Sequence, residues 1–504
     1  MDRDRLDLCG FWRFQPDPYA EGDALGFSSE ELDTRLWREV RVPCGFDRCG
    51  PGLETYEGPG WYRRGLLVPE SWRGQAALLR FEGINNRSRL WVNGHLVAES
   101  DLPWLPVKAE VSRHLRPGEA NTLTAWADST RRPQDVPGRQ RGWRTSGGIL
   151  RECSLTAAAP RWIDDLWVDA VPSPGGGDLI AHASARALGS VEDTSVRLSV
   201  LAPDGAEVLS LASNSLPVRA GGVTSWELSS SLKGAQPWSP ERPALYQAVV
   251  TLCSGGREVD RQTRRFGFRR IEISEGDLRL NGSRLFLTGF NRHEDTPGRG
   301  PLPDLARTRE DLEAMKEAGC NYVRLCHYPH HSLELDLCDE LGLLVMSEIP
   351  LYWWNGLQEG EEACGAKLDA ARRQVEAMIR RDRSHPSVIF WSVGNETSEA
   401  LPEVSEGNAQ LVRLARELDP TRLAVHVSDK WPHTPHFEED DCLCLNAYPS
   451  WGGRCWSANP AYDPARSAEW WREEIESLKA LYPGKPVIVT ECGYPALEGI
   501  AEGA

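Results

Sequence analysis

The second half of the chain alternates short apolar runs with amphipathic segments, and this alternation restricts the possible folds strongly. From about residue 273 onward, seven runs rich in β-branched and aromatic residues are separated by stretches with helical periodicity. Strands that alternate with helices predict repeated βα units around a parallel sheet. The predicted strands are Leu285–Gly289, Tyr322–Cys326, Leu343–Ser347, Val388–Val393, Leu423–Val427, Cys442–Leu445 and Val487–Thr490.

A closed (β/α)8 TIM barrel needs one strand more than this pattern supplies. The chain reaches Ala504 too soon after Glu491 for a further helix and strand. We therefore expect a barrel that is truncated after its seventh strand, in a sequence that is incomplete. One of its helices is expected from Thr308 to Ala318, with Thr308 and Asp311 placed like a capping box and Gly319 as the C-terminal stop.

The first half of the chain consists of short strand patterns with turns between them. In residues 1–160, Asn93-Gly94 predicts a hairpin, because both residues tolerate the positive φ values of a type I′ turn. Residues 161–272 alternate again around a turn at Asp204-Gly205. The Pro-Gly cluster at 172–177 lies inside a strand pattern, so we expect a loop rather than a linker. The expected domains are two β-sandwiches, 1–160 and 161–272, followed by the barrel, 273–504.

Charge and cysteine content narrow the class of protein. The formal charge of -17 opposes binding to nucleic acid or to an anionic membrane, because both attract clustered Lys and Arg. The apolar runs are too short to span a bilayer, and no secretory signal follows Met1. The 13 scattered cysteines without a C-x-x-C pair predict reduced, buried thiols. We expect a cytoplasmic protein, with an exported one that has lost its leader as the alternative. A homo-oligomer is compatible with the sequence, which does not fix the number of subunits.

Two carboxylates stand at the ends of predicted barrel strands. Glu396 follows the fourth strand in the stretch Gly394-Asn395-Glu396, and Glu491 directly follows the seventh. Catalytic residues of such barrels collect at the carboxyl ends of the strands. A pair of carboxyl groups is what hydrolysis of a glycosidic bond requires, one to protonate the leaving oxygen and one to stabilise the anomeric carbon. The alternative is that each Glu only caps a strand or forms a surface ion pair.

Three stretches around the predicted strand ends resemble glycoside hydrolase family 2, the β-galactosidase and β-glucuronidase family. They are Gly289-Phe290-Asn291-Arg292-His293-Glu294, Asn321-Tyr322-Val323-Arg324-Leu325-Cys326-His327-Tyr328-Pro329, and the segment from Arg381 to Glu396. The resemblance covers nearly the whole chain. It implies a jelly-roll sugar-binding-like domain, an immunoglobulin-like sandwich and a TIM barrel, in the order that the strand patterns predict.

The resemblance also implies roles for individual residues. Glu396 matches the general acid/base of the family and Glu491 the nucleophile that forms a covalent glycosyl-enzyme. Asn395 matches a residue that binds the sugar 2-hydroxyl. Arg324 matches an arginine that keeps the nucleophile ionised, which is physically reasonable because a nearby cation lowers the pKa of a carboxyl group. The environments of the two carboxylates would then separate their roles.

Other matching residues are implied to line the sugar-binding subsite. His293 and His327 match histidines that contact sugar hydroxyls, and the alternative is a pair of polar loop residues. Tyr448 resembles a tyrosine that hydrogen-bonds the nucleophile, although a tyrosine near a strand end also fits the core. Trp353 and Trp354 follow the third strand, where they either stack on a sugar or pack the barrel rim.

The chain departs from the family pattern at two places. The ligands that hold magnesium after the third strand in some β-galactosidases are missing from the stretch Glu348 to Trp354, so we expect no obligatory metal and no other cofactor. His327, His330 and His331 are interpreted as a polar loop rather than a metal cluster. Arg141 occupies a position where some relatives place a sugar-binding aspartate, which leaves the identity of the sugar open.

The sequence therefore predicts a retaining exo-β-glycosidase with a carbohydrate substrate. The Gly394-Asn395 pairing and the lack of recognisable uronate-binding residues favour a neutral sugar, as in a β-galactosidase. A β-glucuronidase of the same family is the first alternative. A catalytically inactive carbohydrate-binding or scaffold protein is the second.

Overall fold

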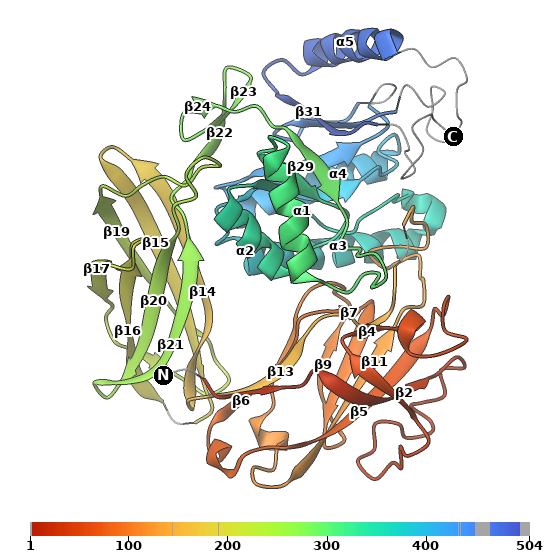
Figure 1. Cartoon of the computed structure of the whole chain (residues 1–504), viewed down its shortest axis with the longest axis vertical. Helices are drawn as coiled ribbons and strands as arrows, with labels where there is room; N and C mark the ends of the chain where they lie inside the picture. Colours follow the sequence, from red (N-terminus) through yellow and green to blue (C-terminus); the bar gives the residue numbers. More distant parts are fainter. Residues whose placement is uncertain are drawn as a thin grey trace.

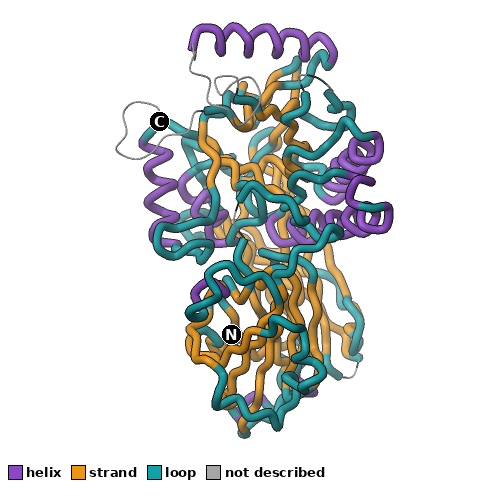
Figure 2. The backbone as a smooth tube through the Cα atoms, turned by 90° about the vertical axis from the view of Figure 1, so that its right-hand side faces the viewer, coloured by secondary structure: helices purple, strands orange, loops and turns teal. Residues whose placement is uncertain are grey.

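The computed structural model of the chain describes residues 3–143, 145–189, 191–431, 433, 435–448 and 464–493. Three units follow one another along the sequence (Figure 1). The first unit, coloured red to orange, lies below the C-terminal unit, coloured green to blue, and the second unit lies beside both. Long helices gather around the C-terminal strands, whereas the first two units are built mainly from strands and loops (Figure 2).

The first unit is a β-sandwich made of antiparallel sheets. Its main sheets have the strand orders β1-β13-β6-β10 and β3-β2-β5-β11-β8-β9, and a small sheet has the order β4-β12-β7. Trp12, Phe14, Phe46 and Phe81 are nearly inaccessible to solvent in the core. The strands are β1 (Arg5–Asp7), β2 (Gly10–Pro16), β3 (Arg38–Val42), β4 (Cys44–Gly45), β5 (Pro59–Leu67), β6 (Ala76–Phe81), β7 (Ile84–Asn85), β8 (Arg87–Val92), β9 (His95–Ser100), β10 (Val107–Glu110), β11 (Ala120–Asp128), β12 (Gly148–Ile149) and β13 (Cys153–Ala158).

The second unit is a smaller sandwich of two antiparallel sheets with the orders β14-β15-β19 and β17-β16-β20-β21, where β18 also pairs with β16. Its core is the aliphatic cluster between the sheets, to which Tyr246, Phe266 and Phe268 add aromatic contacts. The strands are β14 (Arg161–Ser173), β15 (Gly176–Ala187), β16 (Glu192–Leu201), β17 (Glu207–Ala212), β18 (Leu216–Val218), β19 (Thr224–Lys233), β20 (Tyr246–Ser254) and β21 (Arg257–Phe266).

The predicted turns are confirmed in both sandwiches. Asn93 and Gly94 connect β8 to β9 with φ values of 48° and 77°, as a type I′ turn requires. Gly205, with φ 86°, lies in the turn between β16 and β17. The Pro-Gly cluster at 172–177 contains the turn between β14 and β15, whose register runs to Ser173↔Gly176, so it is a hairpin end and not a linker.

The third unit contains seven parallel strands in chain order, which confirms the predicted barrel architecture in the described residues. A hairpin sheet of β22 (Ile271–Ser274), β23 (Asp277–Leu280) and β24 (Ser283–Arg284) precedes them. The barrel strands are β25 (Gly289–Arg292), β26 (Tyr322–Leu325), β27 (Leu344–Glu348), β28 (Val388–Asn395), β29 (Leu423–Ser428), β30 (Leu443–Asn446) and β31 (Val487–Glu491). The helices are α1 (Leu305–Glu317), α2 (Ser332–Leu341), α3 (Glu361–Asp382), α4 (Pro402–Leu418) and α5 (Pro464–Leu481).

Burial and curvature of this sheet bring its two outer strands together. Every residue of β26, β27, β28 and β29 is buried, as expected for parallel strands covered on both faces. The side-chain nitrogen Nδ2 of Asn291, on β25, donates to the carbonyl oxygen of Thr490, on β31, at 2.9 Å. The carboxyl ends of the first and seventh strands therefore meet at one rim.

Two predicted boundaries were wrong. The first barrel strand begins at Gly289, because only Gly289–Arg292 pairs with β26, whereas the preceding Leu285 and Leu287 pack against a buried apolar cluster. Helix α1 begins at Leu305 and not at Thr308, because the side chain of Asp304 accepts a hydrogen bond from the Arg307 N–H and caps the helix. Gly319, with φ 84°, follows the end of α1 as predicted.

Buried polar contacts join the barrel to both sandwiches. Arg151 of the first unit donates to the Glu294 carboxylate at 2.8 Å and to the carbonyl of Pro329 at 2.8 Å. Arg269, just after the last strand of the second unit, donates to the carbonyls of Pro386, Thr421 and Val388. A buried guanidinium fixes its partners firmly, because an unpaired buried charge is costly. Among the described residues, no helix has both the length and the apolar character needed to cross a bilayer.

Candidate active site

The two predicted carboxylates lie at the same rim of the barrel. Glu396 directly follows β28, and Glu491 is the last residue of β31. Glu396 has φ 51°, a left-handed conformation that a non-glycine residue adopts at a cost of about 1–2 kcal/mol. Its backbone N–H donates to the carbonyl of Val427 at 2.8 Å, which ties this turn to β29. The strained turn ends β28 and leaves the Glu396 side chain partly buried at the rim.

Glu491 is held by two donors. Its Oε1 accepts from Arg324 at 2.7 Å, and its Oε2 accepts from the Tyr448 hydroxyl at 2.7 Å. His327 Nε2 lies 3.8 Å from the same Oε1. Burial disfavours the charged form of Glu491, but Arg324, His327 and the hydrogen bonds outweigh it and lower the pKa below the usual glutamate value. Glu491 is therefore the carboxylate that stays ionised.

Glu396 occupies a different electrostatic environment. Its Oε2 accepts from the Trp353 indole N–H at 2.8 Å, and its Oε1 accepts from Asn446 at 2.9 Å. No cation is among the groups that act most strongly on it. Burial raises the pKa of Glu396, and the negative charges of Glu491 and Asp429 raise it further, more than the two hydrogen bonds lower it. Glu396 is therefore the carboxylate that retains its proton more readily.

Beneath the pair, Glu348 anchors the arginine. Glu348 ends β27, is inaccessible to solvent, and accepts from Arg324 at 2.7 Å and from Ser392 at 2.8 Å. Its Oε1 also lies 2.7 Å from His327 Nδ1. Burial opposes its charge, yet Arg324 and His327 lower the pKa of Glu348 to about 2. Because removing one partner of a buried ion pair typically costs about 3–5 kcal/mol, Glu348 holds Arg324 in place.

Asn395 has a buried amide with an unused donor. Its Oδ1 accepts from Arg324 at 2.6 Å and from Asn446 at 3.2 Å. Its Nδ2 is buried and has no hydrogen-bond partner among the described residues. Buried donors are rarely left unpaired in native proteins, so an acceptor supplied by a ligand is the natural partner for this group.

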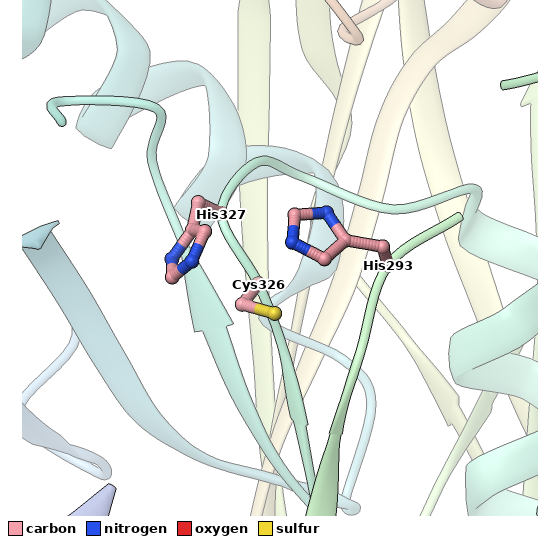
Figure 3. A group of neighbouring side chains, drawn as sticks. All are labelled: His293, Cys326 and His327. Carbon is pink, nitrogen blue, oxygen red and sulfur yellow. The ribbon is translucent and has the colours of Figure 1, made fainter. Parts of the chain in front are cut away.

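Aromatic and imidazole rings form one wall of the site. His293 follows β25, and its ring lies 5.3 Å from that of His327, which follows β26 (Figure 3). Burial and the nearby His327 lower the pKa of His293 to about 3, so this ring is neutral near pH 7. Trp143, from the first unit, has ring contacts at 5.9 Å with His293 and 6.4 Å with Tyr352. The first unit therefore contributes directly to the wall.

A glycine brings that loop of the first unit against the barrel rim. A Cβ added at Gly142 would lie 2.7 Å from the Tyr352 hydroxyl oxygen and 3.4 Å from the Trp353 ring. A side chain at this position would therefore have to displace the Tyr352 hydroxyl. Arg141, which directly precedes Gly142 in the sequence, donates to the Thr145 hydroxyl within the loop.

The remaining candidates lie outside this cluster or on its edge. Trp353 donates to Glu396, whereas Trp354 is buried in the barrel core. His330 pairs with Glu334 and the carbonyl of Cys326, and His331 pairs with Glu152 of the first unit. These two histidines therefore belong to separate structural contacts.

Two groups of described residues bring three possible metal ligands within 4.8 Å of one another. The first is Asp336, Asp339 and His385. Its groups are already used, because His385 pairs with Asp339 at 2.6 Å and Asp336 pairs with Arg265 at 2.7 Å. The second group is His293, Cys326 and His327, at the wall of the site (Figure 3).

Sequence reasoning does not single out Glu348, Asn446 or Trp143 as members of the site. Glu348 and Asn446 each end a barrel strand, as Glu491 does, so the strand-end rule applied to every strand would find both. Trp143 carries no such signal, because it reaches the site from another domain.

Comparison with known proteins gives the same architecture. Residues 24–159 match the profile "Glycosyl hydrolases family 2, sugar binding domain", residues 163–269 match "Glycosyl hydrolases family 2", and residues 271–502 match "Glycosyl hydrolases family 2, TIM barrel domain". The chain is similar in fold to a putative β-galactosidase from Bacteroides fragilis, with a TM-score of 0.87 and 23% identity, over 100% of this chain and 74% of that one.

Curated relatives share sequence across much of the chain. A β-glucuronidase of Paenibacillus borealis is 27% identical over 537 residues, which cover 99% of this chain and 84% of that protein. A β-galactosidase of Psychromonas ingrahamii is 29% identical over 451 residues, which cover 82% of this chain and 42% of that protein. The chain thus spans less than half the length of this β-galactosidase. The three profiles, which follow one another over nearly the whole sequence, show that the chain belongs to glycoside hydrolase family 2.

Proposed function

We propose that the chain is a retaining exo-β-glycosidase that releases a terminal β-linked sugar by double displacement. The observation that carries this proposal is the pair of rim carboxylates whose pKa values are pushed in opposite directions, Glu396 upward and Glu491 downward. Two carboxyl groups with opposed environments are what an acid and a nucleophile need in the same site. The substrate is accordingly a carbohydrate.

In the first step, Glu396 donates its proton to the glycosidic oxygen while Glu491 attacks the anomeric carbon. The C–O bond to the leaving group breaks, and a covalent bond forms between the anomeric carbon and a Glu491 oxygen. Arg324 and Tyr448 keep Glu491 ionised and oriented before the attack. In the second step, Glu396, now a carboxylate, takes a proton from water, whose oxygen displaces Glu491 from the sugar.

Residues of the wall and floor bind the sugar. The unpaired Nδ2 of Asn395 donates to a sugar hydroxyl, which is the 2-hydroxyl by analogy with the family. His293 and His327 offer ring nitrogens to other hydroxyls, and the neutral state of His293 lets one ring nitrogen accept and the other donate. Trp353 positions Glu396 through its indole hydrogen bond.

A neutral sugar of the β-galactoside type is the first candidate substrate. A β-glucuronide is the second, because the P. borealis β-glucuronidase matches along 99% of this chain and 84% of its own length. Chromogenic β-galactoside, β-glucuronide, β-glucoside and β-mannoside, assayed side by side, distinguish the two. The proposal expects hydrolysis of at least one, with the highest kcat/KM for the galactoside. A folded protein that binds sugars and hydrolyses none of the four would instead be a carbohydrate-binding or scaffold protein.

The pH dependence of kcat/KM follows from the two pKa directions. The active form has Glu491 ionised and Glu396 protonated. Activity therefore rises as the pH increases through the lowered pKa of Glu491 and falls as the pH increases through the raised pKa of Glu396. A bell-shaped profile is expected, and its two apparent pKa values belong to the coupled pair. A profile whose alkaline limb survives unchanged in Glu396→Gln would contradict the assignment of the acid.

Removal of metal ions is expected to leave the activity nearly unchanged. The proposed steps use only the carboxylates and their protein donors, and the expected family magnesium ligands after the third strand are absent from the sequence. Turnover of an aryl β-glycoside should be measured before and after EDTA treatment and gel filtration. Strong loss of activity that Mg²⁺ restores would show that this expectation is wrong.

We also propose the cytoplasm as the compartment. Most described cysteines are free and buried, and thiols persist in a reducing environment.

A further inference from the structure

One chemical feature of the site has no part in glycoside hydrolysis, namely the thiol of Cys326. Cys326 and His327 follow β26, and His293 follows the neighbouring β25 (Figure 3). One ligand atom from each of the three residues lies within 4.8 Å of the others. Two imidazoles and a thiol form a donor set suited to zinc and to softer transition metals, and unsuited to Mg²⁺ or Ca²⁺, which need oxygen ligands in number.

In each of the two histidines, Nδ1 already has a partner in the protein, which fixes the orientation of the ring. His327 Nδ1 lies 2.7 Å from the Glu348 carboxylate, which leaves Nε2 facing the site. A carboxylate behind a histidine is the usual support of a metal-binding imidazole, because it fixes the ring and increases the basicity of the other nitrogen. His293 Nδ1 lies 3.4 Å from the Tyr328 hydroxyl. The His293 ring also lies 5.3 Å from the His327 ring, so the two imidazoles face the same part of the site.

The charges around Cys326 favour a cation. The Arg324 guanidinium contacts the carboxylates of both Glu348 and Glu491, so two negative charges face one positive charge. Cys326 is buried, and its thiol donates to the carbonyl oxygen of Arg292 at 3.4 Å, so the sulfur carries its proton. A metal ion must therefore displace the thiol proton: the S–H bond breaks, a sulfur–metal bond forms, and the proton passes to solvent.

We infer that His293, Cys326 and His327 form an inhibitory binding site for a thiophilic transition metal ion such as Zn²⁺. His293 is partly buried, whereas Cys326 and His327 are buried. Glu491 Oε1, 3.8 Å from His327 Nε2, lies close enough to share in coordination. An ion held there occupies the proposed sugar subsite. Its positive charge also makes the carboxylate of the proposed nucleophile less reactive. The inhibition rests on the proposed function, whereas the binding does not.

Titration of the full chain with Co²⁺ tests the site without an activity assay. Cobalt coordinated by a thiolate gives an intense near-ultraviolet charge-transfer band. The wild-type protein is expected to develop this band, and Cys326→Ser to lose it together with at least a tenfold weakening of Zn²⁺ binding. The matched control is Cys492→Ser, which removes an exposed thiol directly after Glu491 and is expected to retain the band. A band that persists in Cys326→Ser, or that disappears in Cys492→Ser, would overturn the assignment.

X-ray absorption at the zinc edge supplies a measurement that needs no variant. The wild-type chain loaded with one equivalent of Zn²⁺ should show one sulfur at about 2.3 Å and nitrogens at about 2.0–2.1 Å. A shell of nitrogen and oxygen alone would exclude Cys326 as a ligand. If the chain hydrolyses a β-glycoside, Zn²⁺ should inhibit the wild type at least tenfold more strongly than Cys326→Ser. Metal binding without hydrolysis would contradict only the proposed function.

Discussion

Replacing Glu491 by glutamine is expected to lower kcat for an activated aryl β-glycoside by about 10⁴- to 10⁶-fold, the scale on which loss of an attacking side chain acts in enzymes with covalent intermediates. The amide keeps the shape of the side chain but cannot attack the anomeric carbon. The fold should survive, because Arg324 still donates to Glu348 from both Nε and Nη2 after the charge at position 491 is lost.

Steady-state kinetics with a dinitrophenyl glycoside measure this loss, and circular dichroism checks the fold. Glu310→Gln is a suitable control, because Glu310 is an exposed carboxylate on α1 that pairs with Arg307 of the same helix and not with a residue of the site. It should leave kcat unchanged. Glu491→Gln with a kcat within tenfold of wild type would exclude Glu491 as the nucleophile.

Replacing Glu396 by glutamine is expected to lower kcat/KM strongly for substrates with poor leaving groups and little for substrates with good ones. With an alkyl or other poor leaving group, kcat/KM should fall by about 10²- to 10⁴-fold, because general acid catalysis is lost. With a dinitrophenyl leaving group the first step needs no proton, so kcat/KM should change little while kcat falls, since the glycosyl-enzyme accumulates. Azide, which attacks without a general base, should restore turnover and yield a glycosyl azide.

The glutamine amide at position 396 introduces an unfavourable contact of its own, so a second variant is needed as a control. Trp353 and Asn446 each donate to one oxygen of Glu396, so the NH₂ group of glutamine would face a donor. Glu396→Ala removes this conflict and should show the same dependence on the leaving group and the same rescue by azide. Equal losses for good and poor leaving groups, without azide rescue, would rule out Glu396 as the acid/base.

The ends of the barrel strands could be predicted from the sequence because two rules act together there. Parallel strands buried on both faces appear as continuous apolar runs, such as Val388–Asn395, and the polar residue that ends such a run points into the site. This is how Glu396 and Glu491 are found. The boundaries of β25 and α1 were not found, because tertiary packing of Leu285 and capping by Asp304 decide them.

The contacts among the site residues could not be predicted in the same way. The pairing of Arg324 with Glu348, Glu491 and Asn395 joins four strands, and no local pattern encodes which oxygen each donor reaches. The opposed pKa directions of the two carboxylates follow from those contacts. The approach of Trp143 depends on how the first sandwich docks on the barrel, through Arg151 among others.

Mass spectrometry of a trapped intermediate tests the proposed mechanism most directly. A 2-deoxy-2-fluoro β-glycoside with an activated leaving group slows both steps, so the glycosyl-enzyme accumulates and its peptic digest can be sequenced. The double-displacement mechanism predicts one fluoroglycosyl group per chain, attached to Glu491. Turnover of the parent glycoside with no adduct, or an adduct on any other residue, would contradict it.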